Sequence, residues 1–136
     1  MLSFQVSLVR PDALIFSGEA DQVDLPGAEG DMGVLAGHAP IVTILRPGIV
    51  KVIANDQDEK FVVMGGVAEF SKEELMILAD SAARIEDFDV AGLKADIEER
   101  EGNLPTISIG QELDREIALL DHYKALHRAL TVTTAM

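Results

Sequence analysis

Three side chains that could do chemistry lie within one glycine-rich segment, which runs from Leu25 to Pro40. Glu29 and Asp31 are carboxylates that can pair with a cation, and His38 can serve as a base, a metal ligand or a hydrogen-bonding group near neutral pH. The segment is interrupted by Pro26, Gly27, Gly30, Gly33, Gly37 and Pro40. Because glycine adopts backbone angles that other residues avoid, and proline fixes φ and lacks a donor, the sequence predicts a tightly folded loop rather than a helix or an uninterrupted strand.

Phosphate and metal chemistry are poorly supported in this segment. A Walker A loop needs Gly-Lys followed by Ser or Thr, whereas Asp31 follows Gly30 here and no Lys lies between Leu25 and Pro40. One histidine and two carboxylates without a paired histidine motif are a weak metal signal. We therefore expect no catalytic residue, no metal and no cofactor.

Nucleophilic catalysis has little support elsewhere in the chain. His122 and His127 fall in a predicted helix, and no serine has the context of a nucleophile elbow. The serines considered are Ser3, Ser7, Ser17, Ser71 and Ser81. A small hydrolase that uses the glycine-rich segment stays open as an alternative, and so does a turn that merely joins two strands.

Protein recognition is the function that the segment favours. A loop held by glycine and proline loses little entropy on binding, and its carboxylates can pair with Arg or Lys of a partner. A free-standing β-sandwich module that binds a ligand or another protein is an alternative within this class.

The composition limits the partners further. The chain has 136 residues, a net charge of −13 and only 11 Lys and Arg, which argues against binding to nucleic acid or anionic lipid. It has no cysteine, and its first residues resemble neither a secretory signal nor a transit peptide. Because no apolar run approaches the roughly 20 residues that span a bilayer, we expect membrane association only through another protein.

The elements that must position these residues change character near residue 86. Before it, short β-branched runs alternate with turn residues, which predicts a β-sandwich or flattened barrel over residues 1–86. The expected strands include Phe4–Val9, Val23–Leu25, Ile41–Leu45, Ile49–Ile53, Lys60–Met64, Val67–Phe70 and Leu75–Ala79. Arg46-Pro47-Gly48 is expected to form a turn, and Gly65-Gly66 is expected to break a strand at a bulge or bend.

Residues 87–136 are expected to form an antiparallel helical hairpin. Val90, Leu93 and Ile97 recur at helical spacing after Asp87 or Asp89, either of which can be the N-cap. A second helix is expected after Ser108, which with Gln111 resembles a capping box. Its stripe, mostly apolar, comprises Leu113, Ile117, Leu120, Tyr123, Lys124, Leu126 and Leu130.

Nearly the whole chain is similar to the epsilon subunit of bacterial F-type ATP synthases, which is called delta in mitochondria. The glycine-rich segment ends in Gly-His-Ala-Pro, as in that family, and three later segments match it in order and spacing. These are Leu45–Gly48, Phe61–Phe70, and Leu75–Asp80 with Ala82. One departure is Ala36, where the family usually has proline.

The resemblance implies a non-catalytic rotor subunit of the central stalk in a proton-translocating ATP synthase. Its β-sandwich would dock on the gamma subunit and the c-ring, with Glu29, Asp31 and His38 in the contact loop. The complex would lie on the cytoplasmic face of the bacterial inner membrane.

The resemblance also implies that the C-terminal hairpin is a possible regulatory element. In the family it can extend along gamma toward the α/β subunits and restrain ATP hydrolysis. Some members bind ATP in the folded hairpin through Ile/Leu-Asp, two residues, then Arg-Ala, but Leu113–Ala118 has Ile117 where that arginine belongs. We therefore expect weak or no nucleotide binding, with Asp114 and Arg128 as weak candidates.

Overall fold

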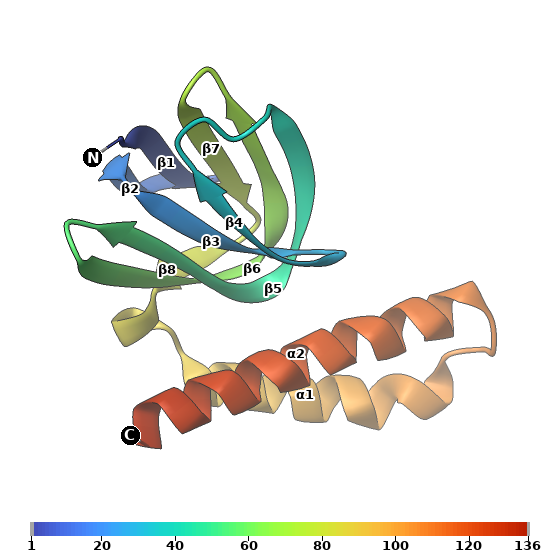
Figure 1. The fold of residues 1–136 in the computed structure, drawn as a ribbon. Coiled ribbons are helices and arrows are strands. Elements are labelled where there is room, and N and C mark those ends of the chain that lie inside the picture. The colour runs from blue at the N-terminus through green and yellow to red at the C-terminus, as the bar shows by residue number, and fades with distance from the viewer. Residues whose placement is uncertain (1, 136) are drawn as a thin grey trace. The chain divides into compact units, whose positions relative to one another are not determined.

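The computed structural model describes residues 2–135, which form eight strands followed by two long helices (Figure 1). The strands are β1 (Phe4–Arg10), β2 (Ala13–Ala20), β3 (Gln22–Gly27), β4 (Gly30–Leu35), β5 (Ile41–Ala54), β6 (Gln57–Ser71), β7 (Glu74–Ala79) and β8 (Ala82–Arg84). The helices are α1 (Val90–Asn103) and α2 (Gln111–Ala135), with the short 3-10 turns η1 (Ile85–Asp87) and η2 (Leu104–Thr106). The predicted fold class, a β-sandwich followed by a helical hairpin, is confirmed.

The chain divides into two compact units between Phe88 and Asp89. Met1 and Met136, the outer ends of the two domains predicted from sequence, lie outside the described residues. No helix among the described residues is both long enough and apolar enough to cross a bilayer.

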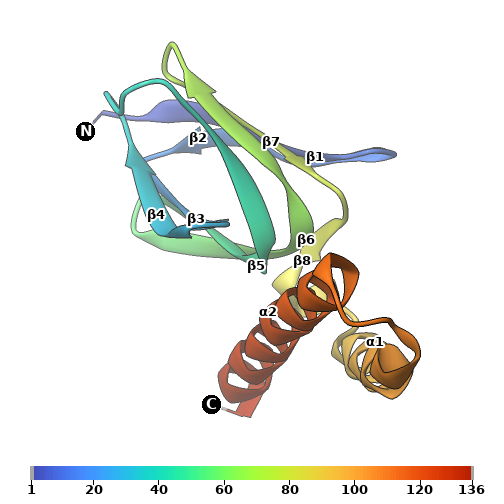
Figure 2. The ribbon, with the colours of Figure 1, turned by 90° about the vertical axis from the view of Figure 1, so that its right-hand side faces the viewer.

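The strands of the first unit form one continuous ladder that folds over on itself. Their order is β2-β1-β7-β6-β5-β3-β4, β8 pairs with β6, and β1 and β7 are parallel neighbours. The long strands β5 and β6 curve so that the sheet makes two layers (Figure 2). The core between the layers includes Phe4, Val6 and Leu8, which are at most 2% exposed, so the predicted alternation along β1 is confirmed.

The prediction of a turn at Arg46-Pro47-Gly48 is wrong, because these residues lie within β5. The β3–β5 pairing shifts in register between Asp24 and Gly27, close to where Pro47 lacks an N–H to donate. A Cβ on Gly48 would lie 2.5 Å from the Cβ of Pro26, so glycine lets β3 pass close to β5. Pro47 and Gly48 therefore allow β3 and β5 to approach closely where their register shifts, and the chain does not turn.

The break predicted at Gly65-Gly66 is also wrong, since β6 runs through both residues. At this point β6 changes neighbours: residues 61–63 pair with β8, and residues 66–71 pair with β7. Both glycines have positive φ, 109° and 143°. They accommodate the change of neighbour without ending the strand.

The second unit consists of the antiparallel helices α1 and α2, as predicted (Figure 1). Asp89 is the N-cap of α1, and its carboxylate accepts a hydrogen bond of 2.9 Å from the backbone N–H of Gly92. The predicted cap at Ser108 is wrong, because α2 begins only at Gln111. The apolar side chains buried on the two helices are Leu93, Ile97, Leu120, Tyr123, Leu126 and Leu130, whereas Ile117 is 43% exposed.

Candidate partner-binding site

The glycine-rich segment is mostly a β-hairpin, so the prediction of a loop is wrong for most of its length. β3 and β4 pair from Gln22↔Leu35 to Gly27↔Gly30, and only Ala28 and Glu29 form the turn between them. The reason is that the glycines lie at the turn and along the free edge strand, while Val23, Leu25 and Val34 keep alternating into the core.

Gly27 and Gly30 shape this turn for two different physical reasons. A Cβ on Gly27 would lie 2.6 Å from the carbonyl oxygen of Gly30, which is too close for any side chain. Gly30 has φ of 142°, a conformation that is favourable only without a Cβ. The backbone N–H of Ala28 also donates to the carbonyl oxygen of Ile44 at 2.8 Å, so the turn is tied to β5.

Asp31 is engaged within the chain. Its carboxylate accepts a hydrogen bond from Nη2 of Arg46 on β5, and Nη1 of the same guanidinium donates to the carbonyl oxygen of Gly27. Glu29 is exposed at the turn, and among residues 2–135 no hydrogen bond or ion pair to its carboxylate is found. The two carboxylates therefore have different environments, although they are only two residues apart.

His38 lies beyond the opposite end of β4 and is half-buried. Its Nδ1 lies 2.7 Å from the carbonyl oxygen of Ala39, and its ring meets the Phe70 ring edge-on with centroids 5.9 Å apart. The preceding residue, Gly37, donates its backbone N–H to both carboxylate oxygens of Glu73, at 3.0 and 3.2 Å. Glu73 belongs to the β6–β7 turn, so that turn holds the segment that carries His38.

The structure does not bring Glu29, Asp31 and His38 together as one site. Asp31 is at the start of β4 and His38 follows its end, a separation of roughly 13 Å or more along an extended strand. Among the described residues, no group of three or more His, Cys, Asp or Glu side chains is placed to hold a metal ion. This geometry suits neither the hydrolase alternative nor a metal site, and it suits a surface contact.

An exposed apolar row crosses the outer face of the sandwich. Ile44 pairs with Val67, Val67 with Leu78, Leu78 with Val9, and Val9 with Leu14, so these side chains share one face across five strands. Four of them are 40–66% exposed: Ile44, Val67, Leu78 and Leu14. Exposed apolar surfaces of this kind are typical of surfaces that bind other proteins.

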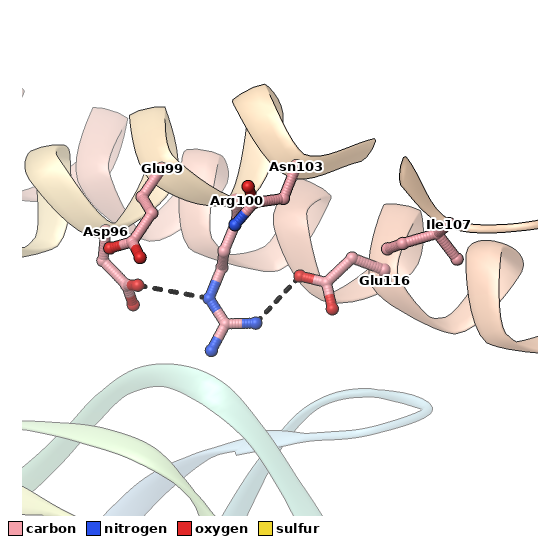
Figure 3. A pocket seen from close by; sticks show the side chains of 6 residues that line it. All are labelled: Asp96, Glu99, Arg100, Asn103, Ile107 and Glu116. Carbon is pink, nitrogen blue, oxygen red and sulfur yellow. Dashed lines mark hydrogen bonds and ion pairs between the residues drawn. The ribbon is translucent and has the colours of Figure 1, made fainter. Parts of the chain in front are cut away.

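A shallow pocket of about 300 Å³ lies in the helical unit (Figure 3). It is lined by Asp96, Glu99, Arg100, Asn103, Ile107 and Glu116. The Arg100 guanidinium donates to Asp96 at 3.3 Å and to Glu116 at 2.8 Å, and it stacks 5.1 Å from the centroid of the Tyr123 ring. Because its one cation is already paired and three carboxylates surround it, the pocket is poorly suited to a phosphate.

The same contacts shift two pKa values. The hydrogen bond to Glu116 raises the pKa of Arg100. Burial raises the pKa of the Tyr123 hydroxyl, because the ionised form would lose solvation, and the neighbouring Arg100 charge opposes part of that rise.

The weak nucleotide candidates do not form a site. Asp114 and Arg128 lie almost four turns apart on α2, which is about 21 Å along the helix axis. Neither residue lines the pocket at Arg100.

Several of these features were missed from the sequence. The Asp96–Arg100 pair has the i,i+4 spacing of a helical ion pair and could have been found. Arg46–Asp31, Gly37–Glu73 and the apolar row depend on strand register, and sequence spacing gives no sign of them.

Residues 3–85 match a protein family described as ATP synthase, Delta/Epsilon chain, beta-sandwich domain. ATP synthase epsilon chain 2 of Nitrobacter hamburgensis is 59% identical over 135 residues, covering 99% of this chain and 99% of the relative. The ATP synthase epsilon chain of Rhodopseudomonas palustris strain BisB5 is 50% identical over 136 residues, covering 100% of this chain and 99% of the relative.

Two solved structures resemble the whole chain. A chain in the cryo-EM structure of the Euglena gracilis mitochondrial ATP synthase, OSCP/F1/c-ring, superposes with a TM-score of 0.76 at 26% identity, covering 94% of this chain and 81% of that one. A chain in the central stalk/c-ring structure of the Tetrahymena thermophila mitochondrial ATP synthase gives 0.61 at 17% identity, covering 96% and 95%, which supports the fold.

Proposed function

Since the chain belongs to the epsilon-chain family of ATP synthases, we propose that it joins the other parts of the rotor through its β-sandwich, binding the gamma subunit and the c-ring. It is a non-catalytic rotor subunit of the central stalk. The observation that carries this conclusion is the 59% identity to an ATP synthase epsilon chain over 99% of both chains.

The apolar row is the surface that suits the gamma subunit. A subunit that turns with the stalk needs an attachment that does not slip, and burial of exposed apolar side chains provides it. Ile44, Val67 and Leu78 lie next to one another on β5, β6 and β7, within the most extensively paired part of the sheet. The strands beneath these residues are therefore a stiff base for transmitting torque.

The β3–β4 hairpin and the residues after it up to Pro40 are the surface that suits the c-ring. Glu29, Asp31 and His38 lie along this contact segment, as the family resemblance implies. The turn at Gly27–Gly30 and the Glu73 contact to Gly37 hold both ends of the segment in place. An ordered edge of this kind loses little entropy on docking.

The helical unit is the part that suits regulation. The two helices are linked by two ion pairs, the half-buried Arg100–Glu116 and the more exposed Lys124–Glu101. Such pairs, open to solvent on one side, contribute little stability, so breaking them adds little to the cost of a rearrangement toward the α/β subunits. The arginine absent at Ile117 and the paired state of Arg100 both weigh against ATP binding in this unit.

In this proposal the chain meets the bacterial inner membrane, on its cytoplasmic face, only through the assembled complex. The decisive experiment is to purify the tagged chain from solubilised membranes of its source. We expect gamma and the α/β subunits to be recovered with it at one copy of this chain per complex. Recovery of the chain alone would instead favour a free-standing binding module.

A further inference from the structure

Arg46 spans the turn of the β3–β4 hairpin. From β5 its guanidinium reaches across β3, where Nη1 donates to the carbonyl oxygen of Gly27, and on to β4, where Nη2 donates to the carboxylate of Asp31. Gly27 is the last residue of β3 and Asp31 is the second residue of β4. One side chain therefore ties both ends of the turn to the neighbouring long strand.

The exposure of the two partners shows which one is anchored. The Arg46 side chain is 26% exposed, whereas that of Asp31 is 80% exposed. The guanidinium is planar and offers donors in a fixed fork, so it can satisfy a carbonyl and a carboxylate at once, which a lysine ammonium on a flexible stem does less well. The backbone bond from Ala28 to Ile44 adds a second tie between the turn and β5.

The charges of Glu29 and Asp31 are consequently in different environments. The charge of Asp31 is compensated by Arg46, while the carboxylate of Glu29 meets no cation among the described residues. An uncompensated carboxylate at an ordered turn is suited to a cationic side chain of a partner, because its position is already fixed before binding.

We propose that Arg46 and Asp31 form an internal latch that positions the β3–β4 turn, and that Glu29 is the carboxylate that meets a basic side chain of the rotor partner. The second part rests on the proposed function of the hairpin as a contact surface. Arg46 and Asp31 are thus positioning residues, which act on the partner only through Glu29.

The latch is tested in the isolated full-length chain by hydrogen exchange of the Ala28 amide. Asp31→Ala and Arg46→Asp each remove the pair, and we expect each to lower the protection of this amide roughly threefold, as for a partly exposed ion pair. Glu29→Ala is the matched control, which removes a carboxylate of the same turn and leaves protection unchanged. Arg46→Lys keeps a cation beside Asp31, and it should lose less protection than Arg46→Asp.

The role of Glu29 is tested by the rate at which the chain rebinds ATP synthase from which this subunit has been removed. Glu29→Ala lowers the association rate roughly threefold at low salt and flattens its dependence on salt. Asp31→Ala combined with Arg46→Ala retains the native salt dependence, because the pair that these substitutions remove carries no net charge.

Two results overturn the proposal. Equal protection of Ala28 in all variants rules out the latch. A salt dependence that is flattened in the Asp31→Ala/Arg46→Ala double variant as much as in Glu29→Ala rules out the division of roles. If the native chain does not rebind the depleted complex, the proposed function fails with the assignment of Glu29, while the exchange data still support or overturn the latch.

Discussion

At the residue scale, Gly66 lies where the partner of β6 changes from β8 to β7, and the sheet leaves no room for a side chain there. A Cβ built on Gly66 would lie 2.2 Å from the carbonyl oxygen of Leu78 and 2.8 Å from the Cα of Ala79. Its φ is also 143°, which side chains rarely adopt. The obstruction comes from backbone atoms of β7, and these can move only if the strand pairing changes.

We predict that Gly66→Ala lowers the free energy of unfolding by about 2 kcal/mol or more, from backbone strain and steric conflict together. Chemical denaturation followed by circular dichroism measures this change. Gly18→Ala is the control in the same sheet, since its nearest neighbour is the end of the Phe16 ring, which can shift, and its φ is unremarkable. Equal stabilities of the two variants would show that a side chain at position 66 causes neither the backbone strain nor the steric conflict described.

At the element scale, α1 and α2 are connected by polar contacts as well as by apolar packing. Arg100 on α1 contacts Glu116 and the Tyr123 ring on α2, and Lys124 on α2 pairs with Glu101 on α1 at 2.7 Å. Burial keeps the Tyr123 hydroxyl protonated to higher pH than usual. The helix pair is therefore sensitive to the ionisation of one tyrosine.

We predict that the pKa of Tyr123 exceeds its ordinary value of 10, with burial as the main cause. Because the folded state binds this proton more tightly than the unfolded state, the associated stability is complete below pH 10 and is lost as pH rises through the raised pKa. Tyr123 is the chain's only tyrosine, so ultraviolet absorbance of tyrosinate reports on it alone.

The control for this titration is Tyr123→Phe, which keeps the ring over Arg100 and removes the ionisable group. The free energy of unfolding of this variant should fall less above pH 10 than that of the native chain, because no tyrosine ionises. A native tyrosine that titrates at or below 10 would show that the hydroxyl is not stabilised in its protonated form.

At the scale of the whole molecule, the two compact units carry different surfaces. The first unit combines the apolar row with the ordered β3–β4 hairpin, while the second is a charged helix pair. This division fits a rigid attachment in one unit and a regulatory element in the other.

We predict that Ile44→Asp combined with Val67→Asp weakens binding to the gamma subunit at least tenfold, because two adjacent carboxylates would be desolvated in the interface. Because Ile44 and Val67 pair directly across β5 and β6, the two carboxylates also repel each other in the isolated chain, so its folding is first verified by circular dichroism. Calorimetric titration with purified gamma measures the affinity. Asn55→Asp combined with Gln57→Asp adds the same two charges at exposed residues of the β5–β6 hairpin tip and is the charge-matched control. An unchanged affinity in the Ile44→Asp/Val67→Asp variant would place the gamma contact elsewhere.

If the helical unit is regulatory, as proposed, we predict that removing residues 89–136 raises ATP hydrolysis by the assembled enzyme severalfold, because the proposed restraint on the α/β subunits is then absent. The cut falls at the boundary between the two compact units. Assembly of the shortened chain into the complex must first be verified by its recovery with gamma. Hydrolysis equal to that of the native enzyme would leave the helical unit without an inhibitory role.

Local patterns in the sequence were sufficient for the class of fold and for the family. Period-two alternation at Phe4, Val6 and Leu8 predicts a strand from its own residues, and helical spacing after an acidic N-cap at Asp87 or Asp89 predicts α1 in the same way. These signals are reliable because the residues that carry them are neighbours in the chain.

Residues that usually break strands led to wrong predictions, because pairing with neighbouring strands outweighed their local conformational preference. Pro47 and Gly48 favour a turn, yet they lie within β5, where the close approach of Pro26 on β3 requires a residue without a Cβ at Gly48. The proposed contact surfaces also depend on neighbouring strands rather than on local sequence. The apolar row joins residues as distant as Val9 and Leu78, and the latch joins Asp31 to Arg46, so both arise only when strand register brings separate segments side by side.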